Sequence, residues 1–133
     1  MYYNLPCAIG ELWDKYTILL IKLKNIKDKE KLKNIHIEKN HLEIFMNKFE
    51  GYLFNPLFSN LYNTNKKLWN IEDNIRLKEY LKQFDNEFID LSRSVYMTND
   101  KRCMIKKAIN IKFNSDIVEE KEYISYEYPI FDS

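Results

Sequence analysis

Glycine and proline are scarce in this chain of 133 residues, which has two glycines and three prolines. Tight hairpin turns and phosphate-binding loops depend on glycine, because it adopts backbone conformations that other residues avoid. The scarcity therefore argues against an all-β fold and against a glycine-rich phosphate loop. The length predicts one domain over residues 1–133. Apolar residues at 45% and charged residues at 31% are typical of a globular chain rather than a disordered one.

Cysteine and histidine are equally few, with two of each. Cys7 and Cys103 lie far apart and lack the short spacing of zinc ligands, so we expect two reduced thiols in a cytoplasmic protein rather than a disulfide. Glu38 and His41 have the spacing of half a di-iron motif, but such a site needs two of these motifs, and we expect this pair on the surface. No Walker loop, dinucleotide fingerprint or nucleophile elbow occurs.

Long apolar runs are also missing. The apolar run 16–21 has six residues and is flanked by Lys15 and Lys22, whereas a membrane-spanning helix needs about 20. The first seven residues are too short and too polar for a signal peptide. We therefore expect a cytoplasmic location and no membrane partner.

Arginine is the rare cation, with only Arg76, Arg93 and Arg102 beside 18 lysines. Lys, Asn and Ile together make up over a third of the chain, which indicates an AT-rich genome and makes the lysines less informative. A guanidinium forms planar, two-pronged pairs that an ammonium cannot form. We therefore expect at least one arginine in a buried or functional pair.

Charge is unevenly distributed although the net charge is only +1. Residues 15–48 and 99–112 are basic, and residues 114–133 are acidic. A nearly neutral chain has no overall attraction for nucleic acid. We expect the basic segments and the acidic tail to attract each other, and we do not expect a nucleic-acid partner.

Apolar residues recur at three- and four-residue spacing along most of the chain, which predicts amphipathic helices. The expected helices cover residues 9–26, 28–49 and 57–83. A fourth begins at Asp85, and a fifth follows the N-cap signal Thr98-Asn99-Asp100 and ends near residue 113. The tail 117–133 is aromatic and acidic and contains Pro129, which blocks a helix. The sequence predicts an all-α bundle of four to five helices with an extended C-terminal tail packed on it.

Two groups of acidic residues have the spacing of one helix face. Glu11 and Asp14 lie three residues apart, and carboxylates so placed can hold a metal ion, as they do in helical pyrophosphohydrolases. The second group is Trp69, Glu72, Asp73 and Arg76, in which both acids have helical spacing to the arginine. For either group the alternative is structural: a solvated face for the first and a salt-bridge cluster for the second.

A third group is basic and lies in the expected last helix. Arg102, Lys106 and Asn110 follow one another at four-residue spacing, so they share one helix face. Like charges in line are tolerable on a solvated surface and are useful when they face an anion such as a phosphate or a carboxylate. Around this line stand further polar or aromatic residues, namely Arg93, Tyr96, Asn99 and Asp100.

Several blocks appear in order and cover most of the chain. They are IGELWDKYTIL (9–19), LWNIEDNIR (68–76), SVYMTNDKR (94–102) with IKKAIN (105–110), and VEEKEY (118–123). Together they resemble DUF6165, an uncharacterised bacterial family of unknown function. The resemblance implies no activity, although members are often seen near genes for surface glycans and glycosyl transfer. It also implies polar family positions, which are Glu11, Asp14, Lys15, Glu72, Asp73, Arg76, Arg93, Asn99, Asp100, Arg102, Lys106, Glu119, Glu120 and Lys121.

The first functional hypothesis is a binding or accessory module for an anionic small molecule, such as a phosphosugar or a sugar nucleotide, or for a protein of glycan synthesis. Arg76, Arg102 and Lys106 would hold the anion, and Trp13 or Trp69 would stack on a sugar or base. The full expected ligand-binding set is Trp13, Lys15, Trp69, Arg76, Arg93, Tyr96, Asn99, Asp100, Arg102 and Lys106.

Two other hypotheses compete with it. In a metal-dependent phosphohydrolase or transferase, Mg²⁺ or Mn²⁺ would be held by four carboxylates from the first and third helices, namely Glu11, Asp14, Glu72 and Asp73. In a purely structural helical subunit, the same charges would pair internally. The sequence does not decide between these hypotheses. It also does not show whether the chain forms a homo-oligomer.

Overall fold

The computed structural model describes residues 1–126 and consists of four α-helices with one short 3-10 helix. The helices are α1 (Ile9–Asn25), α2 (Lys29–Met46), α3 (Pro56–Tyr80) and α4 (Asn86–Lys112), with the 3-10 helix η1 (Tyr52–Phe54) before α3. No strand occurs in this part of the chain, so the predicted all-α class is confirmed. Three residues on which the predicted packing of the tail depended, Tyr128, Ile130 and Phe131, lie outside the described residues.

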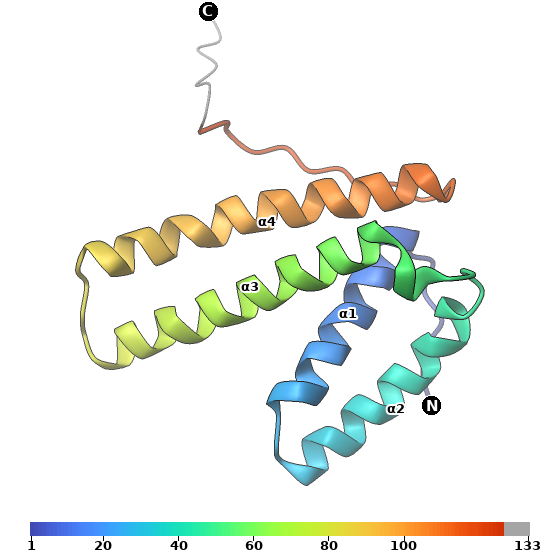
Figure 1. Cartoon of the computed structure of the whole chain (residues 1–133), viewed down its shortest axis with the longest axis horizontal. Helices are drawn as coiled ribbons and strands as arrows, with labels where there is room; N and C mark the ends of the chain where they lie inside the picture. The colour runs from blue at the N-terminus through green and yellow to red at the C-terminus, as the bar shows by residue number, and fades with distance from the viewer. Residues whose placement is uncertain (127–133) are drawn as a thin grey trace, which may run out of the picture.

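The helices form two hairpins of unequal length. The long hairpin of α3 and α4 extends to one side, and the shorter hairpin of α1 and α2 lies against its other end (Figure 1). α1 packs against both α3 and α4, whereas α2 packs mainly against α1. α1 is thus the central helix of the fold, because it contacts all three others. Among residues 1–126, no helix combines the length and apolarity needed to cross a bilayer.

Polar side chains fix where most helices begin. The side chains of Asp28, Asn55 and Asp85 each accept a hydrogen bond from a backbone N–H in the following turn, which is the N-cap arrangement. Pro56 occupies the first position of α3, where its missing N–H costs nothing. After α2, Gly51 adopts a φ of +68°, a left-handed conformation that glycine tolerates best.

An aromatic cluster forms the core where α1, η1, α3 and the end of α4 meet. Trp13 is fully buried at its centre. The rings of Phe49, Tyr52, Phe58 and Phe113 lie around it, with centroids at 5.6, 6.4, 5.9 and 5.1 Å. This cluster joins three helices around one side chain, so Trp13 belongs to the core and has no face available for a ligand, contrary to the sequence-based prediction.

α4 is one continuous helix, and the predicted break at residues 98–100 is wrong. Thr98 is buried between helices. The side chain of Asn99 accepts a hydrogen bond from Arg102, and that of Asp100 pairs with Lys121. All three side chains make contacts within the helix or with other segments instead of capping a new helix, so the tertiary structure overrides the local signal. Two predicted ends also differ slightly, since α2 ends at Met46 and α3 at Tyr80.

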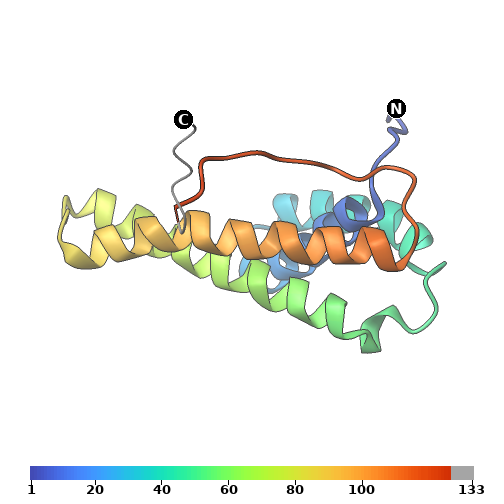
Figure 2. The same ribbon diagram turned by 90° about the horizontal axis from the view of Figure 1, so that it is seen from above.

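Residues 116–126 form a segment, here named the C-terminal strap, that turns back and runs along α4 (Figure 2). Three ion pairs attach it, namely Glu119 to Lys106 at 3.5 Å, Glu120 to Lys107 at 3.1 Å and Lys121 to Asp100 at 2.8 Å. The rings of Tyr126 and Tyr96 also meet, with centroids 5.2 Å apart. The expected attraction between the acidic tail and a basic helix is therefore observed for the strap.

Candidate functional site

The N-terminus of α1 meets α4 at very close range. A Cβ atom added at Gly10 would collide with the carbonyl oxygen of Lys106. The backbone N–H of Gly10 donates to Asn110 Oδ1 at 2.6 Å, and that of Ile9 donates to Ser115 Oγ at 3.0 Å. Side chains from the other end of the sequence therefore satisfy the N–H groups that a helix start leaves free. Sequence reasoning did not identify this role for Asn110 and Ser115.

This close crossing brings a buried carboxylate against an arginine. Asp14 is only 1% exposed, and its two oxygens accept hydrogen bonds from Nε, at 2.8 Å, and Nη2 of Arg102. Asn65 Nδ2 donates to Asp14 Oδ1 at 2.9 Å and to Thr17 Oγ1 at 3.0 Å. The hydrogen bond to Asp14 raises the pKa of Arg102. The expected arginine pair is thus confirmed: the buried carboxylate of Asp14 is hydrogen-bonded through both oxygens, the form in which a buried charge is tolerated.

A second ion pair lies one helical turn away. Lys106 Nζ contacts Glu11 Oε2 at 2.6 Å and Glu119 Oε1 of the strap at 3.5 Å. Burial lowers the pKa of Lys106, but the hydrogen bond to Glu11 and the nearby carboxylate charges outweigh burial, so the net pKa is raised. Lys15 is mostly exposed and stands 4.0 Å from Glu11. This polar cluster holds α1, α4 and the strap together.

Ion pairs occupy three of the four carboxylates that were predicted to bind a metal. Glu11 pairs with Lys106, Asp14 with Arg102, and Glu72 with Arg76. No group of three His, Cys, Asp or Glu side chains gathers anywhere in residues 1–126. The described part of the chain therefore does not assemble the predicted Mg²⁺ or Mn²⁺ site of Glu11, Asp14, Glu72 and Asp73.

The second predicted group lines an open groove between α1, α3 and α4, here named the tryptophan groove. Its volume is about 400 Å³. Its lining residues are Ile18, Ile21, Asn65, Leu68, Trp69, Glu72, Asp73, Arg76 and Arg102. The half-buried indole of Trp69 and the aliphatic side chains make an apolar surface. At the rim, Arg76 Nη1 contacts Glu72 Oε2 at 2.5 Å.

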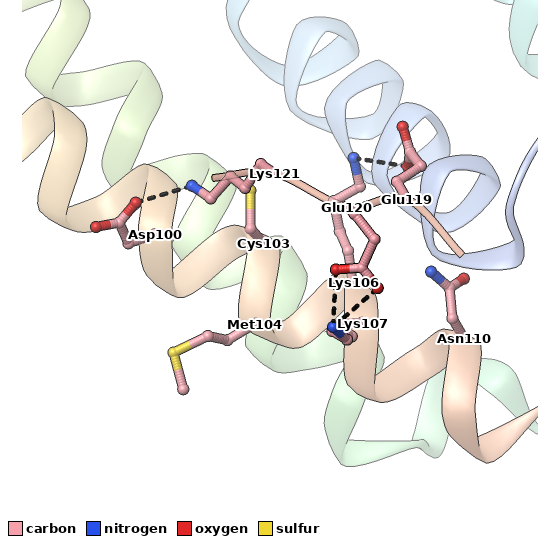
Figure 3. A pocket seen from close by; sticks show the side chains of 9 residues that line it. All are labelled: Asp100, Cys103, Met104, Lys106, Lys107, Asn110, Glu119, Glu120 and Lys121. Atoms are coloured by element: carbon pink, nitrogen blue, oxygen red, sulfur yellow. Dashed lines mark hydrogen bonds and ion pairs between the residues drawn. The ribbon is translucent and has the colours of Figure 1, made fainter. Parts of the chain in front are cut away.

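The third predicted group divides between two places. Arg102 faces the tryptophan groove, while Asp100 and Lys106 line a cavity of about 370 Å³ under the strap (Figure 3). In this cavity Asp100 and Lys106 face strap residues of opposite charge, so its cations have carboxylate partners. Of the remaining predicted residues, Arg93 is exposed and Tyr96 contacts the ring of Tyr126.

The structure therefore unites Trp69, Arg76 and Arg102 from the predicted ligand set and separates the others. Sequence reasoning missed Asn65, Ile18 and the aliphatic floor of the groove, because nothing in their local pattern distinguishes them from ordinary core positions. The only available signal was Asn65 itself, a polar residue on the apolar side of a predicted helix.

Comparisons with known proteins return a family and nothing more specific. No curated protein and no solved structure matches the chain significantly. Residues 5–133 match the family of unknown function DUF6165. This match covers nearly the whole chain, including every residue that lines the tryptophan groove. The chain therefore belongs to the family DUF6165.

Proposed function

We propose that the chain is a helical binding module that holds a phosphosugar or a sugar nucleotide in the tryptophan groove. One observation carries the proposal: an aromatic ring, two arginines and two carboxylates border a single space of about 400 Å³. Ligand sites in proteins combine a concave apolar surface with a few polar groups in this manner. The genomic setting that the family resemblance implies, near genes for surface glycans, agrees with this class of ligand.

The groove suits a ligand that carries a ring, hydroxyl groups and a negative charge. The indole of Trp69 offers a flat apolar face for a base or for the C–H face of a sugar. Carboxylates accept hydrogen bonds from sugar hydroxyls, and Asp73 has no hydrogen bond or ion pair within residues 1–126. Arg76 is engaged by Glu72 through one nitrogen, which leaves further N–H groups for a phosphate.

Arg102 adds a donor that is held in place before the ligand arrives. Of its five N–H groups, two are taken by Asp14, and Nη1 makes a long contact of 3.4 Å with Asn99. Because the buried carboxylate fixes the guanidinium, little side-chain entropy is lost when a ligand binds. The Asp14 pair therefore has a role in both stability and binding in this proposal.

A purely structural subunit is the competing interpretation. It explains the buried cluster around Asp14 but gives no reason for an indole and Arg76 at the border of an open groove. A hydrolase has no support from the carboxylates, because they are paired with cations or isolated in the described residues.

Calorimetric titration with glucose 1-phosphate, UDP-glucose and glucose tests the proposal. We expect a phosphorylated probe to bind and to change the fluorescence emission of Trp69. Trp69→Phe should remove this change, while the emission of the core Trp13 remains. Arg76→Ala should weaken binding by about 1.5–3 kcal/mol, which is roughly 10- to 150-fold in Kd.

Arg93→Ala is the matched control for Arg76→Ala, because Arg93 is exposed on α4 and does not line the groove. It should leave binding unchanged. If no probe binds, or if Arg76→Ala and Arg93→Ala behave alike, the small-molecule proposal is wrong. A structural or protein-binding subunit would then be the better interpretation.

A further inference from the structure

We propose that α3 and α4 form a second binding site, which takes a phosphate group, at a groove distinct from the tryptophan groove. This inference is independent of the function proposed above. The second groove, here named the lysine groove, has a volume of about 470 Å³ and lies between α3 and α4, with no lining residue from α1 or α2. The residues that carry the argument are Asn60, Asn63, Thr64, Lys67, Thr98 and Lys101.

The first observation is an uncompensated positive charge. Two lysines and no carboxylate line the lysine groove. Lys67 and Lys101 make no ion pair with any of residues 1–126. This distinguishes them from Arg102 and Lys106, which carboxylates already neutralise. An anion entering the lysine groove would therefore meet two ammonium groups without displacing a carboxylate.

The second observation concerns two buried hydroxyl groups, one from each helix. Thr64 is 4% exposed and Thr98 is 5% exposed, yet neither hydroxyl makes a hydrogen bond within the described chain. Buried polar groups are nearly always hydrogen-bonded. The only side-chain polar atom in this part of the chain that is fully sealed without a partner is Trp13 Nε1. Both threonine hydroxyls must therefore open onto the groove that they line.

The contrast with Thr17 shows that this arrangement is not a property of buried threonine in this fold. Thr17 is also buried, and its hydroxyl donates to the carbonyl oxygen of Asp14 at 2.8 Å and accepts from Asn65. Thr64 and Thr98 have no such partner within residues 1–126, so both hydroxyls are available to a group that binds in the groove.

The chemistry of the lining selects the ligand. Ammonium, hydroxyl and amide groups together supply hydrogen-bond donors on two sides of the groove, from Lys67 on α3 and Lys101 on α4 among others. A phosphate has several acceptor oxygens and is bound by such donors. A divalent cation is usually held by at least one carboxylate, which the groove lacks, and the two lysines would repel it. Two lysines are too few for a nucleic-acid surface, which contacts many phosphates. The ligand is thus a single phosphate group, either free or as a monoester.

Binding of inorganic phosphate and of glucose 1-phosphate, measured by NMR titration of the amide signals of α3 and α4, tests the inference. We expect shifts that centre on residues 64, 67, 98 and 101 with at least one of the two probes. The relative affinity of the two probes then tells free phosphate from a monoester. Lys67→Ala and Lys101→Ala should each raise Kd roughly tenfold, since each removes one charged hydrogen bond.

Two controls make the result specific. Lys66→Ala removes a neighbouring exposed lysine outside the lysine groove and should not change the Kd for phosphate. Trp69→Ala alters the tryptophan groove and should likewise leave phosphate binding at the lysine groove unchanged. Thr98→Val keeps the shape and removes the hydroxyl, so it should weaken phosphate binding without lowering the melting temperature of the free protein. Absence of shifts at α3 and α4 with both probes, or equal binding by a Lys67→Ala/Lys101→Ala double variant, would overturn the inference.

Discussion

At the scale of single residues, the cluster around Asp14 has the strongest constraints in the molecule. A carboxylate that is 1% exposed survives in the core because Arg102 and Asn65 supply three hydrogen bonds to it. Removing Arg102 leaves Asp14 buried without its counter-charge, and removing Asp14 leaves a partly buried Arg102 unpaired. Either change should cost more than losing an exposed pair. The surface pair of Glu72 and Arg76 offers the contrast within the same protein.

We therefore expect Asp14→Asn to destabilise the protein by about 3–5 kcal/mol, because it removes the counter-charge of Arg102 while preserving side-chain size. Urea unfolding monitored by circular dichroism gives this free energy. Glu72→Gln, which breaks the exposed pair, should cost less than about 1 kcal/mol. Comparable losses in the two variants would show that the buried cluster contributes no more than a surface salt bridge.

Gly10 gives a second prediction at the residue scale. Replacing it by alanine should destabilise the protein, although alanine has the higher helix propensity. Glycine to alanine in a helix usually stabilises it by about 1 kcal/mol. Here the new Cβ would meet the backbone of Lys106, which cannot rotate away as a side chain can. Gly10→Ala should therefore lower the stability to thermal unfolding by about 1–3 kcal/mol. Asn74→Ala, on the exposed face of α3, is the control and should leave stability unchanged or slightly higher.

At the scale of elements, the strap depends on charge, because its contacts to α4 are mainly ion pairs. The hydrogen bonds from Lys121 and Tyr126 lower the pKa of Asp100, and the bond to Asp100 raises the pKa of Lys121. A lowered carboxyl pKa contributes stability above its ordinary value of 3.8, and this contribution is lost as pH falls through the folded-state pKa. A raised ammonium pKa contributes stability below its ordinary value of 10.5, and this stability is lost as pH rises through the folded-state pKa.

The strap should consequently stay attached at neutral pH and detach in acid below pH 3.8. Nuclear Overhauser effects between the rings of Tyr96 and Tyr126 measure whether the strap is attached to α4. Asp100→Asn should weaken that contact already at neutral pH, and high salt should weaken it in the wild type. Asp90→Asn changes an acid of α4 that has no ion pair in the described chain and should have no effect. A ring contact that persists at pH 2 would mean that apolar packing, rather than charge, holds the strap.

Element positions are also what the sequence predicted best. The starts of the helices near Ile9, Asp28 and Asp85 and the all-α class follow from apolar spacing and, at Asp85, from a capping residue, which are local signals. The break predicted at residues 98–100 failed for the complementary reason, since the partners of those side chains include Lys121, which is remote in sequence.

At the scale of the whole molecule, the site could be predicted only in part. The grouping of Trp69 with Arg76 was visible because their seven-residue spacing places them two turns apart on one helix face. The pairing of Asp14 with Arg102 joins residues 88 positions apart, and nothing in the local pattern of either residue specifies the other. The lysine groove was missed for the same reason, because its two halves belong to different helices and lysines are common throughout this chain.

The long reach of these contacts has a consequence for how the protein is made. The backbone groups at the start of α1 bond to Asn110 and Ser115, which follow 100 and 106 positions later. At a synthesis rate of about 5–20 residues per second, α1 waits roughly 5–20 s for these partners to be translated. For most of that interval Asp14, the most deeply buried charge of the described chain, lacks its partner Arg102, which follows 88 positions later. Completion of the fold therefore waits for the synthesis of the end of α4 and the residues just after it, rather than for the appearance of its central helix.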